Sequence, residues 1–166
     1  GLKRIDGILG GIACGVSRLI VRPRKSFLNS PPKILVIRPG GIGDAVLLYP
    51  ALAALRSEFP GSTVHVLAEK RNAGILSGCP YKDAVLLYDS SPLKTLSGVI
   101  KEGYDVVIDT EQWHRMTAAL SFLTRASVRA GFATNDVRAR LFTHPAAHRR
   151  EDYEAVSFLN LVSAVT

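Results

Sequence analysis

The stretch Ile34–Leu52 reads ILVIRPGGIGDAVLLYPAL and joins two apolar segments through a glycine-rich turn. The first segment, Ile34–Ile37, is a short β-branched run that predicts a fully buried strand. Apolar residues at helical spacing then run from residue 44 to residue 59, and Pro60-Gly61 closes the predicted helix. A buried strand, a tight turn and a helix in this order are typical of an α/β protein with a parallel sheet.

The same alternation of strands and helices continues along the chain. Further strands are predicted at residues 63–68, 84–88, 105–109 and 128–132, and further helices at residues 72–76, 93–101, 112–123 and 152–164. Because the strands are nearly all apolar, the parallel sheet must be covered by helices on both faces. The sequence therefore predicts a Rossmann-like, doubly wound α/β fold, in which ligands bind at the carboxyl ends of the strands.

Size and composition restrict the class of protein. The chain has 166 residues, of which 47% are hydrophobic and 21% charged, and this suits one globular domain. Its net charge of +7 favours acidic partners such as anionic lipid or a phosphorylated substrate. Nucleic acid is not expected, because no recognition-helix pattern appears. The two cysteines, Cys14 and Cys79, lack metal-ligand spacing, which indicates a reducing compartment.

Residues 1–30 differ in character from the rest and are interpreted as a basic, amphipathic N-terminal segment with a linker. Residues 1–25 carry six basic side chains against one acidic side chain, and apolar residues recur there at helical intervals. Three interpretations stay open: a helix packed on its own domain, an anchor at the membrane interface, or a signal peptide. The prolines at 31 and 32 end the segment, so the domain is expected to span residues 31–166.

The glycine turn is not a standard nucleotide site. No Gly-Lys-Ser follows Gly43, which excludes a Walker A loop, and Val46 stands where the dinucleotide fingerprint has its third glycine. One interpretation is structural: the glycines allow a tight turn, and Asp44 is favoured in the first turn of a helix. The other is functional, because a carboxylate at the open mouth of the sheet could accept a proton from a substrate hydroxyl.

Several separated blocks resemble one enzyme family. They are IRPGGIGDAVLLYPALAALRSEFPGSTVHVLAEKRNAGIL (37–76), PYKDAVLLYD (80–89), YDVVIDTEQWHRMTAAL (104–120) and VRAGF (128–132). Together they resemble the N-terminal half of the glycosyltransferase family 9 enzymes, the ADP-heptose:lipopolysaccharide heptosyltransferases and their relatives. The resemblance covers residues 33–166 and implies a GT-B fold, in which two Rossmann-like domains face each other across a cleft. The N-terminal domain binds the lipid-linked sugar acceptor. A C-terminal donor domain, expected to be absent from this chain, binds the nucleotide sugar, ADP-heptose or a similar donor.

The resemblance also implies roles for particular residues. Asp44 matches the family's catalytic base, and the turn around it supplies acceptor contacts. The sequence Asp-Thr-Glu-Gln-Trp at 109–113 stands where heptosyltransferases commonly have Asp-x-Gln-Gly. The expected acceptor-binding residues are Arg38, Gly41, Gly43, Lys70, Arg71, Glu111, Trp113 and Arg115. Cations on strand-end loops are well placed for anionic groups. No metal ligand and no cofactor other than the donor are expected.

The implied function is glycosyl transfer in lipopolysaccharide biosynthesis at the cell envelope. By resemblance the reaction is inverting and independent of metal, and this chain would be inactive without the donor domain. The expected partners are a lipid-linked sugar acceptor, the anionic surface of the inner membrane and the C-terminal domain. The expected location is cytoplasmic, peripheral on the inner face of the cytoplasmic membrane. The alternative is a non-catalytic Rossmann-like module that binds an acidic glycolipid or a membrane surface.

Other polar residues carry weaker predictions. His65 lies inside a strand and is expected to be a hydrogen-bonded core residue, whereas His114 could contact an acceptor or be structural. The basic residues of the last loop predict a solvated surface patch or an anion contact. They are Arg138, Arg140, Arg149 and Arg150.

Overall fold

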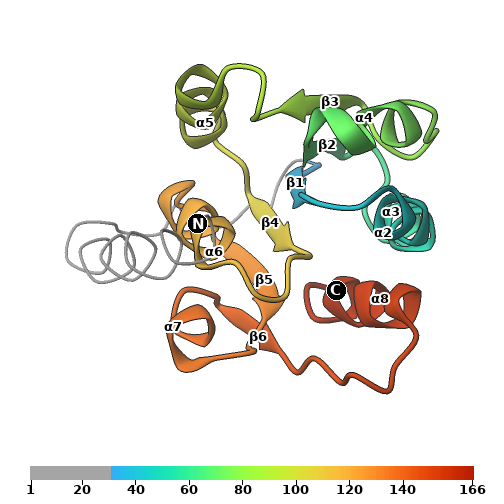
Figure 1. Ribbon diagram of the computed structural model, residues 1–166, viewed down its shortest axis with the longest axis vertical. Coiled ribbons are helices and arrows are strands. Elements are labelled where there is room, and N and C mark those ends of the chain that lie inside the picture. Colours follow the sequence, from blue (N-terminus) through green and yellow to red (C-terminus); the bar gives the residue numbers. More distant parts are fainter. Residues whose placement is uncertain (1–30) are drawn as a thin grey trace.

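The computed structural model describes residues 31–166, so the predictions for residues 1–30 lie outside the part described. Figure 1 shows one sheet with helices on both of its faces. All strand pairs are parallel, and the order across the sheet is β3-β2-β1-β4-β5-β6. The strands are β1 (Lys33–Ile37), β2 (Thr63–Ala68), β3 (Ala84–Leu87), β4 (Val106–Asp109), β5 (Val128–Phe132) and β6 (His144–Ala146). This confirms the predicted doubly wound parallel sheet.

The strand order places a topological switch point between β1 and β4. The chain builds outward from β1 through β2 to β3, then returns to the other side of β1 and builds outward from β4 to β6. Ile37 pairs with Asp109 in the register of these two central strands, so the two strands end side by side. In open α/β sheets the crevice beyond such a switch point is the usual ligand site.

The helices form two layers, one on each face of the sheet (Figure 1). The first layer consists of α2 (Ile42–Leu47), α3 (Tyr49–Glu58), α4 (Lys70–Ser77) and α8 (Glu154–Ser163). The second layer consists of α5 (Pro92–Lys101), α6 (Arg115–Leu123) and α7 (Asp136–Ala139).

Successive side chains of a strand point to opposite faces of the sheet, and they contribute in this way to both hydrophobic cores. Ile34 and Val36 belong to the larger core with the first helix layer, whereas Leu35 and Ile37 belong to the core under α5 and α6. All four side chains are buried, which is the pattern required of a strand covered on both faces. Cys79 is a buried free thiol in the larger core, as its interpretation as an ordinary buried cysteine requires.

The helix predicted for residues 44–59 is wrong as a single element. The structure has two helices, α2 and α3, with Leu48 between them as the C-cap of one and the N-cap of the other. Pro50 lies in the first turn of α3. A proline has no N–H and cannot continue the hydrogen-bond ladder of a preceding helix, but it is well suited to the start of a new one.

The loop predicted before the last helix contains two short elements, α7 and β6, which the sequence did not indicate. The edge strand β6 pairs with β5 in parallel, and the Ala133 amide donates to the Ala146 carbonyl over 2.8 Å. Between these elements the Phe142 ring packs against the backbone of Gly131, where a Cβ atom would lie 2.2 Å from the ring. Only glycine fits at this position of β5, because any side chain would overlap the ring.

One remaining prediction, for His65, concerns the second face of the sheet. His65 in β2 shares a hydrogen bond of 2.8 Å with the hydroxyl of the buried Tyr104, which confirms its structural interpretation. Burial raises the pKa of Tyr104 far above its usual range. Within residues 31–166, no helix has both the length and the apolar character needed to cross a membrane.

Candidate functional site

The site lies at the switch point, where the chain leaves β1 and β4. The Arg38 amide donates to the Leu67 carbonyl over 2.9 Å, so the backbone still follows the sheet one residue beyond β1. On the other side, the amide and hydroxyl of Thr110 both donate to the Ile37 carbonyl, over 3.1 and 2.7 Å. The buried Asn72 of α4 donates to the Arg38 carbonyl over 3.0 Å. These bonds fix the backbone where the chain leaves β1 and β4.

The Arg38 side chain folds back under the glycine turn and is only 5% exposed. Its Nε donates to the Pro39 carbonyl over 2.8 Å, and its Nη1 donates to the Thr110 carbonyl over 3.1 Å. The guanidinium also lies 5.5 Å from the centre of the Phe158 ring of α8. Arg38 therefore joins the ends of β1 and β4 to the first helix layer.

The first glycine of the turn makes room for this guanidinium. Gly40 has φ of +109°, a conformation that side chains rarely adopt, and a Cβ atom there would lie 3.1 Å from Arg38 Nη2. Gly41 and Gly43 have ordinary φ angles and more open surroundings. The turn is thus built around a buried cation of the protein, which explains why its sequence does not match a phosphate-binding motif.

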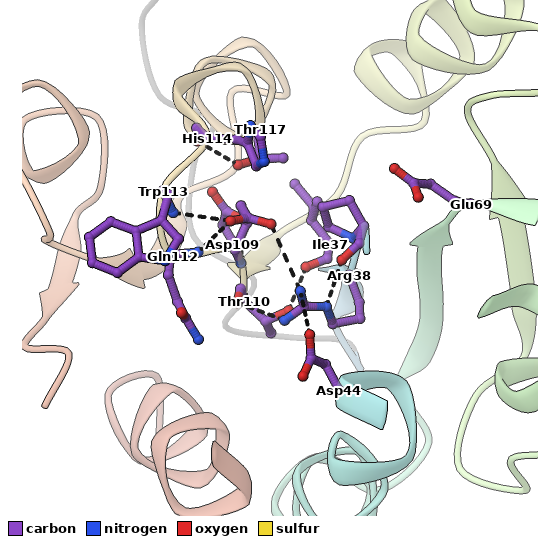
Figure 2. A network of polar contacts seen from close by, with 12 residues as sticks. Ile37, Arg38, Asp44, Glu69, Asp109, Thr110, Gln112, Trp113, His114 and Thr117 are labelled. Atoms are coloured by element: carbon purple, nitrogen blue, oxygen red, sulfur yellow. Dashed lines mark hydrogen bonds and ion pairs between the residues drawn. The ribbon is translucent and has the colours of Figure 1, made fainter. Parts of the chain in front are cut away.

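Two carboxylates flank the Nη2 nitrogen of Arg38, and Figure 2 shows Asp44 facing it from the start of α2. The Oδ2 atom of Asp44 lies 3.5 Å away, and the Oε2 atom of Glu111 lies 3.8 Å away. Their exposure differs strongly, since the side chain of Asp44 is 46% exposed and that of Glu111 only 10%. Asp44, in the first turn of α2, is the carboxylate of the pair that solvent and a bound molecule can reach.

Glu111 is held by the backbone that follows β4. Its Oε1 atom accepts hydrogen bonds of 3.0 Å from the amides of Gln112 and Trp113. Its own amide donates to Asp109 Oδ1 over 3.0 Å. The carboxylate is therefore committed to its own loop and to Arg38, and its predicted contact with an acceptor remains a prediction.

Beneath this loop lies a fully buried ion pair. Arg138 Nη2 and Asp109 Oδ2 are 3.0 Å apart, and neither side chain is exposed. Arg138 also donates to the carbonyls of Phe132, Glu111 and His114, while its guanidinium lies 5.5 Å from the centre of the Phe142 ring. Burial raises the pKa of Asp109 above its ordinary value, and the adjacent guanidinium opposes that rise.

The predicted basic surface patch is wrong for Arg138. Arg140, Arg149 and Arg150 are exposed, but Arg138 is buried and organises the loop after β4. One signal was available in the sequence: Asp109 ends an otherwise apolar strand, and a buried carboxylate needs a cationic or hydrogen-bonding partner. That signal could not identify which arginine would supply it.

Trp113 lies on the same loop and is half exposed. The Arg150 guanidinium lies 5.4 Å from its ring centre, and His148 meets it edge to face at 6.1 Å. His148 in turn packs against Phe132 and lies 3.9 Å from a Glu154 carboxylate oxygen, while Glu154 accepts a hydrogen bond from Gln112. Trp113 thus ties the loop after β6 to the loop after β4.

The other predicted site residues lie at the carboxyl ends of β2 and β4. Lys70 and Arg71 are exposed at the start of α4, and Arg71 pairs with Glu69. Glu69 also accepts a hydrogen bond from the Tyr88 hydroxyl and completes a capping box with Asn72. Its side chain therefore stabilises the start of α4. Arg115 begins α6, next to His114. Residues 31–166 contain no group of three or more acidic, histidine or cysteine side chains arranged to hold a metal ion.

The solved structures that resemble this chain agree on its fold. No family model and no curated protein matches the sequence. Among solved structures, E. coli heptosyltransferase WaaC with ADP superposes with a TM-score of 0.67 at 19% identity, over 79% of this chain and 46% of that one. A family 9 glycosyl transferase from Veillonella parvula gives 0.68 at 19% identity, over 81% and 41%. The E. coli ADP-heptose lps heptosyltransferase II gives 0.62 at 19% identity, over 78% and 40%.

The chain has the fold of one part of the heptosyltransferases. It spans less than half the length of each of these three solved structures. The resemblance seen in the sequence is therefore confirmed at the level of the fold, in a glycosyltransferase-like α/β domain. The roles predicted for individual residues remain predictions.

Proposed function

We propose that this chain is the acceptor-binding half of a glycosyltransferase, with Asp44 as the general base. The observation that carries the proposal is the half-exposed Asp44 carboxylate, 3.5 Å from the buried Arg38, at the switch point of a heptosyltransferase-like fold. A general base must be ionised, fixed in place and within reach of the proton that it removes. Asp44 combines exposure with a fixed cationic neighbour.

In the proposed reaction, an acceptor hydroxyl enters the crevice beside the glycine turn. Asp44 removes its proton while the acceptor oxygen attacks the anomeric carbon of the nucleotide sugar. The new C–O bond forms as the bond from that carbon to the nucleoside diphosphate breaks, and the diphosphate leaves with the electron pair. Attack from the face opposite the leaving group inverts the anomeric centre. Inversion and independence of metal are part of the proposal because the resemblance to the family 9 enzymes implies them.

The donor and acceptor are assigned by chemical class. Exposed cations follow β2, at Lys70 and Arg71, and precede α8, at Arg149 and Arg150. Cations of this kind suit an acceptor carrying phosphate or carboxylate groups. The solved transferases extend well beyond the part that this chain covers, and we assign the nucleotide sugar, ADP-heptose or a similar donor, to a second domain of that kind.

We further propose that the protein acts at the cytoplasmic face of the inner membrane on a lipid-linked sugar of the lipopolysaccharide type. The support is the net charge of +7, which favours an anionic surface. Pelleting with vesicles of anionic phospholipid, compared with vesicles of phosphatidylcholine, tests this assignment. Binding that is equal for the two vesicle types would contradict it.

The test of the base is an Asp44→Asn variant in a protein that carries the donor domain, assayed for glycosyl transfer. The isosteric amide keeps the shape but cannot accept the proton, so turnover should fall at least ~10²-fold. Asp136→Asn is the matched control, because Asp136 is also an exposed carboxylate in the first turn of a short helix. The control should retain turnover within about twofold. Turnover of Asp44→Asn near that of the control would overturn the proposal.

The alternative function, a non-catalytic module for an acidic glycolipid, predicts a different result. In that case Asp44→Asn would change glycolipid affinity no more than Asp136→Asn does. Charge-reversing substitutions at Lys70 and Arg71 would weaken glycolipid binding, and no transfer would occur with any nucleotide sugar. The observation that favours this second candidate is the chain's basic charge.

A further inference from the structure

The Nη2 nitrogen of Arg38 serves two carboxylates at once, and neither lies at hydrogen-bonding distance. Asp44 is 3.5 Å away and Glu111 is 3.8 Å away, whereas the other two guanidinium nitrogens make hydrogen bonds of 2.8 and 3.1 Å to carbonyls. The hydrogen bonds of Nε and Nη1 fix the guanidinium. Asp44 and Glu111 therefore both interact with its positive charge through Nη2.

The two carboxylates beside Arg38 differ in their exposure to solvent. Glu111 is nearly buried and its second oxygen is occupied by two backbone amides, whereas Asp44 is half exposed. A buried guanidinium needs an anionic or strongly polar neighbour, because desolvation of an unpaired charge is costly. Glu111 meets that need from inside the protein, so Asp44 is not required to turn inward.

The backbone of Glu111 is fixed independently of the turn that carries Asp44. Its amide donates to Asp109, and its carbonyl accepts from Arg138, the two partners of the fully buried ion pair. The position of Glu111 relative to Arg38 therefore depends on the core of the domain and not on the exposed surface.

We infer that Glu111 is a positioning residue that shares Arg38 with Asp44 and thereby keeps the Asp44 carboxylate directed at the acceptor hydroxyl. The inference rests on the proposed role of Asp44 as the base. A carboxylate that is the sole partner of an arginine is drawn toward it by the full attraction between the two charges. With Glu111 in place, the attraction of Arg38 is divided between two anions.

The test is a Glu111→Gln variant in the protein that carries the donor domain. The amide oxygen of glutamine can still accept from the two backbone amides, but the charge that faces Arg38 is lost. We expect kcat to fall about 3- to 10-fold. The KM for the acceptor should stay within about twofold of the parent, because the loss concerns the direction of the base and not the binding of the acceptor.

Glu154→Gln is the matched control. Glu154 also contacts this loop, through Gln112, but in the described part of the chain it has no hydrogen bond or ion pair with Arg38. It should leave kcat within about twofold of the parent. A purely structural role for Glu111 would lower the free energy of unfolding and leave the kcat of the folded protein unchanged. Glu111→Gln with the kcat of Glu154→Gln would overturn the inference.

A double-mutant cycle gives a second readout. In an Arg38→Met background, Glu111→Gln should have little further effect on kcat, because the cation that the two carboxylates share is gone. If Glu111→Gln is equally harmful in both backgrounds, the inference fails. Failure of the base itself is distinguishable, since it would appear as normal turnover of Asp44→Asn whatever the result at Glu111.

Discussion

Asp109 and Arg138 form a fully buried ion pair, with 3.0 Å between Asp109 Oδ2 and Arg138 Nη2. The pair joins the end of the central strand β4 to α7, and its arginine also donates hydrogen bonds to three carbonyls. Buried charges are tolerated only where such partners are present. The loop that carries Glu111 and Trp113 is therefore anchored in the core.

Breaking this pair is expected to destabilise the domain. Asp109→Asn should lower the free energy of unfolding by about 3–5 kcal/mol, because it leaves the Arg138 charge buried without its anion. Arg138→Met should be worse, since three carbonyls also lose a donor. Urea denaturation measures both, and Arg140→Met is the control at a neighbouring exposed arginine. The control should stay within about 0.5 kcal/mol of the parent. An equal loss in Arg140→Met and Arg138→Met would contradict the argument.

Gly40 tests the structural role of the glycine turn. Gly40→Ala should destabilise the domain by about 1–3 kcal/mol, because alanine is strained at φ of +109° and its Cβ crowds Arg38 Nη2. Gly43→Ala is the control for stability, since a Cβ atom there meets nothing within 4 Å and the residue lies in α2. We expect Gly43→Ala to be neutral or slightly stabilising in thermal unfolding. Equal melting temperatures for the two variants would refute the assigned role of Gly40.

Asp83 provides a test of pH dependence away from the site. Partial burial favours the neutral acid, but the Val64 amide at 2.7 Å and Arg56 at 2.6 Å outweigh it and lower the pKa of Asp83. Because the pKa is lower in the folded state, the interaction stabilises the fold above the unfolded pKa of about 3.9 and is lost as the pH falls through the folded value.

The urea midpoint of Asp83→Asn should therefore lie below that of the parent at neutral pH, with the difference shrinking below about pH 4. Asp136→Asn serves as the control, and its midpoint should follow that of the parent at each pH. A gap between Asp83→Asn and the parent that stays constant down to about pH 3 would show that the ion pair is not its cause.

Trp113 is the only tryptophan of the chain, so intrinsic tryptophan fluorescence reports directly on the loop after β4. Removing the guanidinium that covers its ring, with Arg150→Ala, should shift the emission maximum to the red and increase quenching by acrylamide. The loss of this cation–π contact should cost about 0.5–1 kcal/mol of stability. Arg149→Ala removes a neighbouring exposed charge and should leave the emission unchanged. Identical spectra for the two variants would mean that Arg150 does not cover the ring in solution.

Much of the fold could be predicted from the sequence because the information is local. The β-branched run Ile34–Ile37 and the later apolar strands can only be stable when covered on both faces, and the helical segments between them supply that cover. The boundaries were less accurate where proline intervened, as at Pro50. The strand β6 was missed because His144-Pro-Ala146 has no apolar periodicity and forms through its pairing with β5.

The site was predictable only in part, because sequence patterns report local structure and not contacts between distant elements. The sequence by itself determined that Asp44 would follow a glycine turn at the carboxyl end of a strand, because turn chemistry and strand patterning are properties of adjacent residues. Only the tertiary structure decided that Gly40 makes room for Arg38, that Arg38 lies between Asp44 and Glu111, and that Arg138 is buried against Asp109. These pairs join β1 to β4, and β4 to α7, and such contacts depend on strand order and packing, which no local pattern encodes.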